Sequence, residues 1–352
     1  MIKKLGIKNF RCINNLELND MGRVTLLTGR NNVGKSSILE SIFMFLDHAS
    51  SDSFQKVNGF RQNSVIYENE FLFEPLFYNQ QMEENIEIKA SLNDDFSLIY
   101  SRDNNFVPGY EPNVPSEVLA SFQASAKNKY ALKFQFVSSD YSESGYYIAN
   151  TNGVFRSINT SNGGEIKQLP FCCFVNSSIV RSERIVIDWV GRLEIKNKKE
   201  ELLDAVRILV PDIKDIFTVM ISGQANLYIK TEKGVIPFSL SGDGTMKLLY
   251  IVLCIIMNPD SIILIDEVEN GLHYSAYKEF WAKVFDIVVK YNCQVIATSH
   301  SYECLESVHK AVYENPNMEN EVVLYRIEKE GKAYRYDIDI FGMAIEGNSE
   351  VR

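Results

Sequence analysis

The sequence predicts an α/β protein built around a parallel sheet. Three short apolar runs rich in β-branched residues, at 24–29, 262–265 and 294–298, indicate buried strands. The first two are followed by segments with helical spacing of apolar residues, at 37–46 and 280–290. Such an alternation of strands and helices is typical of α/β folds.

The first strand leads directly into the segment GRNNVGKSS, residues 29–37, and then into a helix. This segment carries the pattern G-x-x-x-x-G-K-[ST], which forms a phosphate-binding loop when it lies between a strand and a helix. Gly34 lets backbone N–H groups turn toward the phosphates, Lys35 reaches the β- and γ-phosphates, and the Ser36 hydroxyl ligates Mg²⁺. The sequence therefore predicts that ATP and Mg²⁺ bind here. The predicted nucleotide-binding residues are Gly29, Arg30, Asn31, Asn32, Val33, Gly34, Lys35, Ser36 and Ser37.

The middle of the chain has a different character. From about residue 50 to 174 it is rich in Asn, Ser, Tyr and Phe with short alternating runs, and Asn152-Gly153 between two runs predicts a hairpin. Residues 183–210 have a helical pattern that Pro211 ends, and residues 226–240 again indicate a hairpin. Sustained heptads are missing, so no long coiled-coil arm is expected. We therefore expect a β-rich lobe followed by a short helical segment.

A second glycine-rich turn lies far downstream. The segment SLSGDGTMKLL, residues 239–249, runs into a nearly all-apolar helix at 243–257. Backbone N–H groups and the positive dipole end at the start of such a helix form a natural anion site, although the turn could also be a plain helix start. The chain therefore contains two loops that are able to bind phosphate.

Two further polar motifs follow buried strands. Asp266 and Glu267 end the second predicted strand, at the edge where ligands bind in open α/β sheets. Asp266 can hold Mg²⁺ from its outer coordination sphere, and Glu267 can polarise an attacking water, although by themselves the two residues could also form a plain strand end at the surface. His300 follows the third strand, where the γ-phosphate would lie. The predicted catalytic residues are Lys35, Glu267 and His300, and the predicted metal ligands are Ser36 and Asp266.

In this order, the motifs resemble those of ABC-type ATPases of the SMC, RecF and OLD-like branch, particularly the bacterial group described as AAA-family ATPases. The resemblance implies a P-loop NTPase with an ABC-ATPase-like head, a mixed sheet, a β-rich insertion and a helical subdomain. It divides the chain into a first part of the ATPase core at 1–50, the insertion at 51–178, the helical subdomain with a hairpin at 179–235, and the second part of the core at 236–352.

In that family the second loop is the signature motif, which completes the ATP site of the opposite subunit. The resemblance therefore implies a homodimer that closes around ATP. The implied contacts to the partner's nucleotide are Ser241, Gly242, Asp243 and Gly244. The usual signature is Leu-Ser-Gly-Gly-Gln, and two alignments are open here, one with Ser241 and one with Gly242 at the γ-phosphate.

Two other family motifs are less defined. Four glutamines occupy suitable positions for the Q-loop, namely Gln55, Gln62, Gln80 and Gln81. Glu269, Asn270 and Gly271 occupy the D-loop region with a sequence unlike the transporter form. They either relay closure between sites or only form a turn.

Composition bounds the environment of the protein. A net charge of -10 argues against a protein that coats nucleic acid non-specifically. The six cysteines show no CxxC pair and no zinc spacing, which favours a reduced compartment. Neither a secretory signal nor an apolar run of ~20 residues is present. We therefore expect a cytoplasmic protein without membrane contact.

The leading functional hypothesis, also implied by the resemblance, is an ATPase that acts as the sensor of a bacterial anti-phage defence or toxin module. It would control a separate effector such as a nuclease or toxin, since no carboxylate cluster indicates the appended TOPRIM nuclease of OLD proteins. One alternative is a RecF-like clamp on duplex DNA, and another is a scaffold that binds ATP with little turnover. A basic run that could contact DNA phosphates, or be a solvated helix face, comprises Arg181, Arg184, Arg192, Lys196, Lys198 and Lys199.

Overall fold

The computed structural model describes residues 1–61, 72–103, 131–150, 153–163, 168–176 and 183–346. The chain folds into two compact units, each made of several segments. Unit 1 comprises residues 1–21, 31–170 and 327–334, and unit 2 comprises residues 22–30, 171–326 and 335–352. The chain first passes from unit 2 to unit 1 between Arg30 and Asn31, within the phosphate loop, which we define as residues 29–36.

Unit 2 contains a six-stranded sheet in the order β16-β15-β3-β14-β13-β9. Its strands are β3 (Val24–Thr28), β9 (Cys172–Val175), β13 (Ile262–Ile265), β14 (Gln294–Thr298), β15 (Val322–Ile327) and β16 (Ala333–Asp337). The pairs β15–β3, β3–β14, β14–β13 and β13–β9 are parallel. Every residue of β3, β13 and β14 is buried, which explains their continuous apolar sequences.

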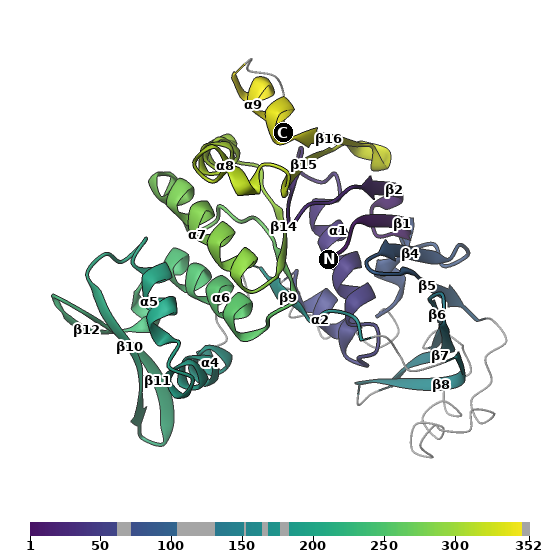
Figure 1. Cartoon of the computed structure of the whole chain (residues 1–352). Coiled ribbons are helices and arrows are strands. Elements are labelled where there is room, and N and C mark those ends of the chain that lie inside the picture. The colour runs from purple at the N-terminus through teal and green to yellow at the C-terminus, as the bar shows by residue number, and fades with distance from the viewer. Residues whose placement is uncertain (62–71, 104–130, 151–152, 164–167, 177–182, 347–352) are drawn as a thin grey trace. The chain divides into compact units, whose positions relative to one another are not determined.

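Helices complete the core of unit 2. They are α4 (Glu183–Ile195), α5 (Lys199–Val206), α6 (Asp243–Met257), α7 (Tyr277–Lys290), α8 (Tyr302–Glu314) and α9 (Ile338–Glu346), together with the short helices η5 (Phe238–Leu240), η6 (Tyr274–Ala276) and η7 (Pro316–Met318). Helix α6 contacts β9 and β13 and is buried along nearly its whole length. Helices α6, α7 and α8 lie side by side (Figure 1).

A small antiparallel sheet completes unit 2. It consists of β10 (Ile213–Ile221), β11 (Gln224–Thr231) and β12 (Gly234–Pro237), paired in that order. Strands β11 and β12 form the hairpin predicted over residues 226–240. The hairpin delivers the chain through η5 to the start of α6.

Unit 1 is built on a seven-stranded antiparallel sheet in the order β2-β1-β4-β5-β6-β7-β8. Its strands are β1 (Lys4–Phe10), β2 (Ile13–Asn19), β4 (Ile86–Ser91), β5 (Asp95–Arg102), β6 (Ala131–Val137), β7 (Tyr141–Asn150) and β8 (Gly153–Gly163), with the helices α1 (Lys35–Leu46), α2 (Ser53–Gly59), η2 (Glu74–Leu76), η3 (Tyr78–Gln80) and η8 (Lys329–Gly331). Phe45 of α1 packs against Phe96 and Phe136 of the sheet, so the helix that follows the phosphate loop is anchored by aromatic contacts.

The α/β class and the mixed strand directions predicted from sequence are confirmed. Strands β7 and β8 pair from Asn150 and Gly153 outward, whereas Asn152 of the predicted turn lies outside the described residues. The four-part division of the chain stays a prediction. The β-rich segment does not form a sheet of its own, because β4 pairs with β1 of the N-terminal hairpin.

One pair of cysteines departs from the sequence-based expectation. Cys173 of β9 and Cys254 of α6 form a disulfide. The pair is 81 residues apart in the sequence, so spacing alone gave no sign of it. Packing of α6 on β9 brings the two sulfur atoms together.

Candidate functional site

The polar motifs converge at one edge of the unit 2 sheet. In the parallel register Leu27 lies opposite Thr298, and Ala297 lies opposite Ile265. The carboxyl ends of β3, β14 and β13 therefore meet at the same edge. The segments that leave these ends are Gly29-Arg30, Ser299-His300 and Asp266-Glu267. The structure thus brings the start of the phosphate loop to the predicted catalytic carboxylate and histidine.

The phosphate loop has the backbone geometry that its glycines allow. Gly29 and Gly34 adopt φ values of 136° and 103°, in a region that side chains rarely enter. A Cβ on Gly34 would lie 3.2 Å from Ile13 Cγ1, so both conformation and space favour glycine. Helix α1 begins at Lys35 and has no acidic residue in its first turn. Its N-terminal N–H groups and dipole therefore suit an anion.

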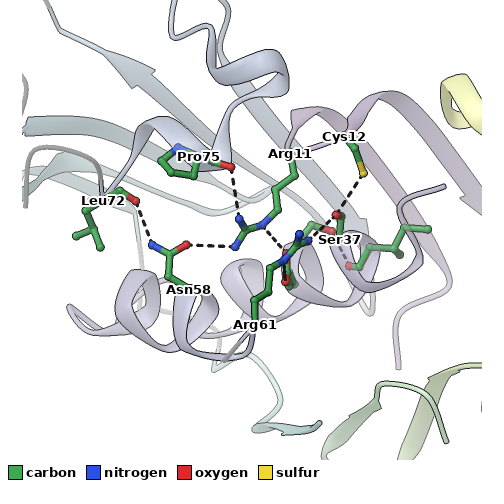
Figure 2. A network of polar contacts seen from close by, with 10 residues as sticks. Arg11, Cys12, Ser37, Asn58, Arg61, Leu72 and Pro75 are labelled. Carbon is green, nitrogen blue, oxygen red and sulfur yellow. Dashed lines mark hydrogen bonds and ion pairs between the residues drawn. The ribbon is translucent and has the colours of Figure 1, made fainter. Parts of the chain in front are cut away.

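An ion cluster around the buried Glu40 holds the first two turns of α1 (Figure 2). Glu40 is almost completely buried and lies 2.5 Å from Arg11 Nε and 2.7 Å from Arg61 Nε. Arg61 also donates to the Ser37 hydroxyl at 3.0 Å, and the Cys12 sulfur lies 3.5 Å from the same oxygen. The Ser37 side chain is therefore engaged in this network, and its backbone N–H is the group that remains suited to a phosphate.

Thr298 organises the predicted metal and base residues from the neighbouring strand. Its hydroxyl donates to Asp266 Oδ1 at 2.6 Å and accepts from the backbone N–H of Glu267 at 2.7 Å. The backbone N–H of Asp266 donates to the Val175 carbonyl at 2.8 Å. One buried threonine therefore fixes both the Asp266 carboxylate and the peptide that follows it.

Glu267 has a strained backbone that several contacts support. Its φ is 48°, which is uncommon for a residue with a side chain and occurs preferentially at functional sites. Asn270 Nδ2 donates to the carboxylate, and Lys247 Nζ donates to the carbonyl oxygen. The Glu267 backbone therefore has two partners, since its N–H donates to Thr298 and its carbonyl accepts from Lys247. These contacts fix the direction in which the side chain leaves the sheet edge.

Lys247 is a buried cation one turn into α6. Its Nζ also donates to the Asp266 carbonyl at 3.3 Å, and only 2% of the residue is exposed. Burial lowers the pKa of Lys247 to about 8, although the carboxylates of Glu269, Asp266 and Glu267 act in the opposite direction. The helix that begins at the second glycine-rich turn therefore contacts the Asp266-Glu267 backbone directly.

His300 is held by an acidic residue of the preceding motif. Glu269 Oε1 accepts from the His300 backbone N–H at 2.9 Å and lies 3.0 Å from His300 Nδ1. The imidazole is 46% exposed, whereas the Glu269 side chain is only 6% exposed. The predicted sensor histidine is therefore half open to solvent at the sheet edge, with one ring nitrogen occupied.

The second loop, residues 241–244, forms the start of α6. Gly242 and Asp243 are exposed, and a Cβ on Gly244 would lie 2.1 Å from the Gly271 carbonyl oxygen. The Ser241 hydroxyl is buried without a hydrogen-bond partner among the described residues. Because Asp243 adds a negative charge to the first turn, its backbone N–H rather than its carboxylate suits a phosphate. Both alignments of the signature stay predictions.

Three residues of this edge were not identified from sequence as functional. In the sequence, Thr298 is recognisable only as the end of a strand, and Lys247 only as part of an apolar helix. The single cation within that apolar run was a usable signal for Lys247, since a buried lysine needs partners. The sequence alone assigns Glu269 only to a relay or a turn. Its contact with His300 depends on the pairing of two strands that are distant in the sequence, so no local pattern indicates it.

The Q-loop prediction stays open. Gln55 lies in α2, Gln80 ends η3 and Gln81 follows it, and all three are exposed. Gln62 lies outside the described residues. None of the three described glutamines belongs to unit 2, where the sheet edge lies.

The donor set fits a magnesium ion that is held partly by phosphates. Among the described residues there is no group of three or more His, Cys, Asp or Glu that could hold a metal alone. Mg²⁺ in nucleotide sites usually takes one or two protein oxygens, with waters and phosphates as further ligands. A serine hydroxyl and one carboxylate, the donor types predicted for Ser36 and Asp266, are chemically suited to that demand.

Comparison with known proteins places the chain in a class. Residues 24–306 match the family described as "AAA domain, putative AbiEii toxin, Type IV TA system". The chain belongs to this family of P-loop ATPases. The ATPase class and the enzymatic activity predicted from the motifs are thereby confirmed.

Individual relatives are more distant. An ATP/GTP phosphatase of Helicobacter pylori is 25% identical over 334 residues, which are 89% of this chain and 89% of that protein. An uncharacterized protein of Methanocaldococcus jannaschii is 34% identical over 113 residues, covering 30% of this chain and 48% of that protein. The crystal structure of the SmcHead bound to the C-winged helix domain of ScpA aligns over 96% of this chain and 98% of its own, with 14% identity and a TM-score of 0.51. This likeness confirms the predicted ABC-type head fold.

No helix in the described part of the chain combines the length and the apolar character that crossing a membrane requires.

Proposed function

We propose that this ATPase hydrolyses ATP at the edge formed by β3, β13 and β14. The observation that carries the proposal is the convergence of the start of the phosphate loop, Asp266-Glu267 and His300 at adjacent strand ends of unit 2. Lys35 and the N-terminus of α1 bind the β- and γ-phosphates, and Glu267 orients and deprotonates the attacking water. His300 contacts the γ-phosphate.

Mg²⁺ belongs to this proposal as the cofactor that neutralises charge on the transferred phosphoryl group. Ser36 and Asp266 are its proposed protein ligands. The Thr298 hydroxyl donates to one oxygen of Asp266, so it orients the carboxylate before any ion binds. A preoriented ligand needs less rearrangement at the moment of binding.

We further propose that the second loop acts on the nucleotide of a second copy of the chain. Gly242 and Asp243 are exposed, and the adjacent Leu240 is 72% exposed, so the start of α6 is accessible to a partner. Two subunits related by a two-fold axis could enclose two ATP molecules, and ATP would then favour the dimer by mass action.

The solution mass of Glu267→Gln tests the dimer. We expect monomer mass without nucleotide and with ADP, and a doubled mass only with Mg-ATP. Adding Ser241→Arg in the second loop should prevent the doubling, whereas Asn317→Arg, at an exposed polar position after α8, should not. A mass that is the same under all nucleotide conditions would contradict ATP-dependent dimerisation.

The biological role that we propose is the control of a separate effector, a nuclease or toxin, in a defence or toxin module of the cytoplasm. The family description names a toxin–antitoxin system, and one solved relative is a head domain bound to another protein's winged-helix domain. Co-expression with the adjacent coding sequence tests this role. Growth should depend on whether this chain carries Lys35 or Lys35→Ala, and identical growth in both cases would contradict ATP-dependent control.

The basic run between residues 181 and 199 gives little support to the DNA-clamp alternative. Arg192 pairs with Asp188 at 2.9 Å, Lys199 pairs with Asp215 at 2.8 Å, and Lys198 lies over the Tyr291 ring. Charges that are already neutralised offer less to DNA phosphates. Arg181 lies outside the described residues.

The scaffold alternative differs from an active ATPase by its expected lack of ATP turnover. A phosphate-release assay measures that turnover.

A further inference from the structure

We propose that Glu269 is the positioning residue of His300, because its carboxylate determines which ring nitrogen carries the proton. This inference rests on the proposed role of His300 at the γ-phosphate. It assigns Glu269 a function in the same ATP site, through the histidine and not through direct contact with nucleotide.

The geometry gives the carboxylate two contacts with one residue. Oε1 of Glu269 accepts from the backbone N–H of His300 and lies at hydrogen-bond distance from Nδ1 of its ring. The first contact is a hydrogen bond that fixes the peptide, and the second is an ion-pair contact that restricts the rotation of the ring. Two contacts from one buried oxygen leave the imidazole little freedom, although nearly half of its surface is exposed.

The chemical consequence concerns the tautomer of a neutral histidine. A carboxylate can only accept, so the nitrogen that faces it must carry the hydrogen. We infer that this hydrogen lies on Nδ1, toward Glu269, which leaves Nε2 with its lone pair as a hydrogen-bond acceptor. A histidine in water favours the opposite arrangement, so Glu269 selects the form with the acceptor at Nε2.

The surroundings of Glu269 support a positioning role over a purely structural one. Its second oxygen, Oε2, is buried without a hydrogen-bond partner among the described residues. Burying a carboxylate with incomplete hydrogen bonding is costly, and an apolar residue would fill the same space at less cost. The charge is partly balanced by attraction to the ammonium of Lys247. A buried carboxylate with one unpaired oxygen, placed against a histidine of the proposed site, supports a positioning role.

The backbone around Glu269 is rigid enough to hold the ring. The Leu272 N–H donates to the Glu269 carbonyl at 3.1 Å, and the Asn270 N–H donates to the Glu267 carbonyl at 2.9 Å. Gly271 packs closely on Gly244, where a Cβ on either residue would meet backbone atoms of the other. The turn therefore cannot shift without disturbing α6.

The tautomer can be measured directly by NMR with ¹⁵N-labelled histidine. The chain has only four histidines, and His300→Gln assigns the signal of interest by its loss. At a pH high enough for the imidazole to be neutral, we expect His300 to carry its proton on Nδ1. In Glu269→Ala the proton should move to Nε2. In Glu269→Gln, whose amide oxygen can still accept from Nδ1–H, the original tautomer should be largely restored.

Kinetics provide the second readout. We expect Glu269→Ala to lower kcat on the order of 10- to 100-fold, as for other residues that orient a site histidine, with little change in ATP affinity. Glu269→Gln should be intermediate. The double variant with His300→Ala should be no slower than His300→Ala alone, since Glu269 acts through that ring. Glu306→Ala, which removes a surface glutamate paired with Lys310, is the matched control.

The outcomes separate this inference from the proposed function. An Nε2–H tautomer in the native protein, or an unchanged tautomer in Glu269→Ala, would overturn the positioning role without any activity measurement. Additive losses in the double variant would do the same. If the tautomer shifts as expected but His300→Ala retains full turnover, the positioning holds and the proposed role of His300 in hydrolysis fails.

Discussion

Replacement of Lys247 by methionine should reduce turnover while changing stability only moderately. Lys247 Nζ donates to the carbonyl oxygens of Asp266 and Glu267, and the Glu267 backbone has a strained φ of 48°. Methionine has a similar length but no charge and no donor. Without the ammonium, the peptide of Glu267 is free to relax toward a more ordinary conformation, and the predicted base moves from its position. A displacement of ~1 Å can cost up to ~100-fold in rate, so we expect kcat to fall at least ~10-fold.

The effect on stability follows from two opposing contributions. Burial lowers the pKa of Lys247 from 10.5 to about 8, so keeping the charged form at neutral pH costs roughly 3 kcal/mol relative to its exposed state. Methionine removes that cost. It also leaves two carbonyl oxygens without their donor, at about 1–3 kcal/mol each. The two contributions largely offset each other, and we expect the free energy of unfolding at pH 7 to change by no more than about 3 kcal/mol.

The pH dependence isolates the charge. Between pH 8 and 10.5 the unfolded chain still binds the lysine proton while the folded chain has released it, so stability rises with pH in this window. Below pH 8 both states are protonated and the full cost is present. The methionine variant lacks this contribution. The stability of the native protein relative to Lys247→Met should therefore increase by about 2 kcal/mol from pH 7 to pH 9.5.

Denaturant unfolding without nucleotide or metal provides the assay. Both tryptophans of the chain, Trp189 and Trp281, lie in unit 2 with Lys247, so their fluorescence reports on the relevant part of the molecule. Lys310→Met, at an exposed position of α8, is the matched control and should change neither kcat nor the pH dependence. If Lys247→Met retains full turnover, or loses stability by 4 kcal/mol or more with no pH-dependent difference, the reasoning is wrong.

Three further changes test the proposed site. Lys35→Ala should abolish nucleotide binding in a fluorescent-nucleotide titration, and retained affinity would contradict the phosphate-loop assignment. Glu267→Gln should keep ATP binding while hydrolysis slows by ~10² or more, as expected when a water-orienting base is lost; unchanged phosphate release would remove Glu267 from that role. Thr298→Val keeps the shape of the strand but removes the hydroxyl that orients Asp266, so Mg²⁺ dependence of turnover should shift to higher concentration, on the order of 10-fold. An unchanged magnesium requirement would show that Thr298 has no part in metal binding.

Local sequence was sufficient wherever function depends on neighbours in the chain. The phosphate loop is a contiguous motif between a strand and a helix, and its glycines have the positive φ values that such a loop needs. The helix predicted from residue 243 to 257 begins and ends at those residues. In both cases the spacing of apolar residues and the placement of glycine carry the information.

Sequence was insufficient where function depends on contacts between distant segments. Thr298 meets Asp266 only because β14 pairs with β13, and Lys247 reaches the same peptides only because α6 packs on that sheet. A threonine at a strand end and a lysine in a helix are ordinary residues until the partners are known. The cluster of the buried Glu40 with Arg11 and Arg61 is another case, since its members lie up to 50 residues apart.

Helix α6 links the proposed dimer to the proposed catalytic step. Its exposed start is the second loop, and Lys247, one turn further, holds the Glu267 carbonyl. Because the helix is buried along nearly its whole length, a displacement of the loop on a partner's nucleotide would be transmitted to Lys247 as a rigid movement. The two functions are still separable by experiment. In the Glu267→Gln background, Lys247→Met should leave the ATP-dependent doubling of mass intact, because the loop itself is unchanged. Loss of that doubling would instead mean that Lys247 maintains the shape of the second loop and does not act by positioning Glu267.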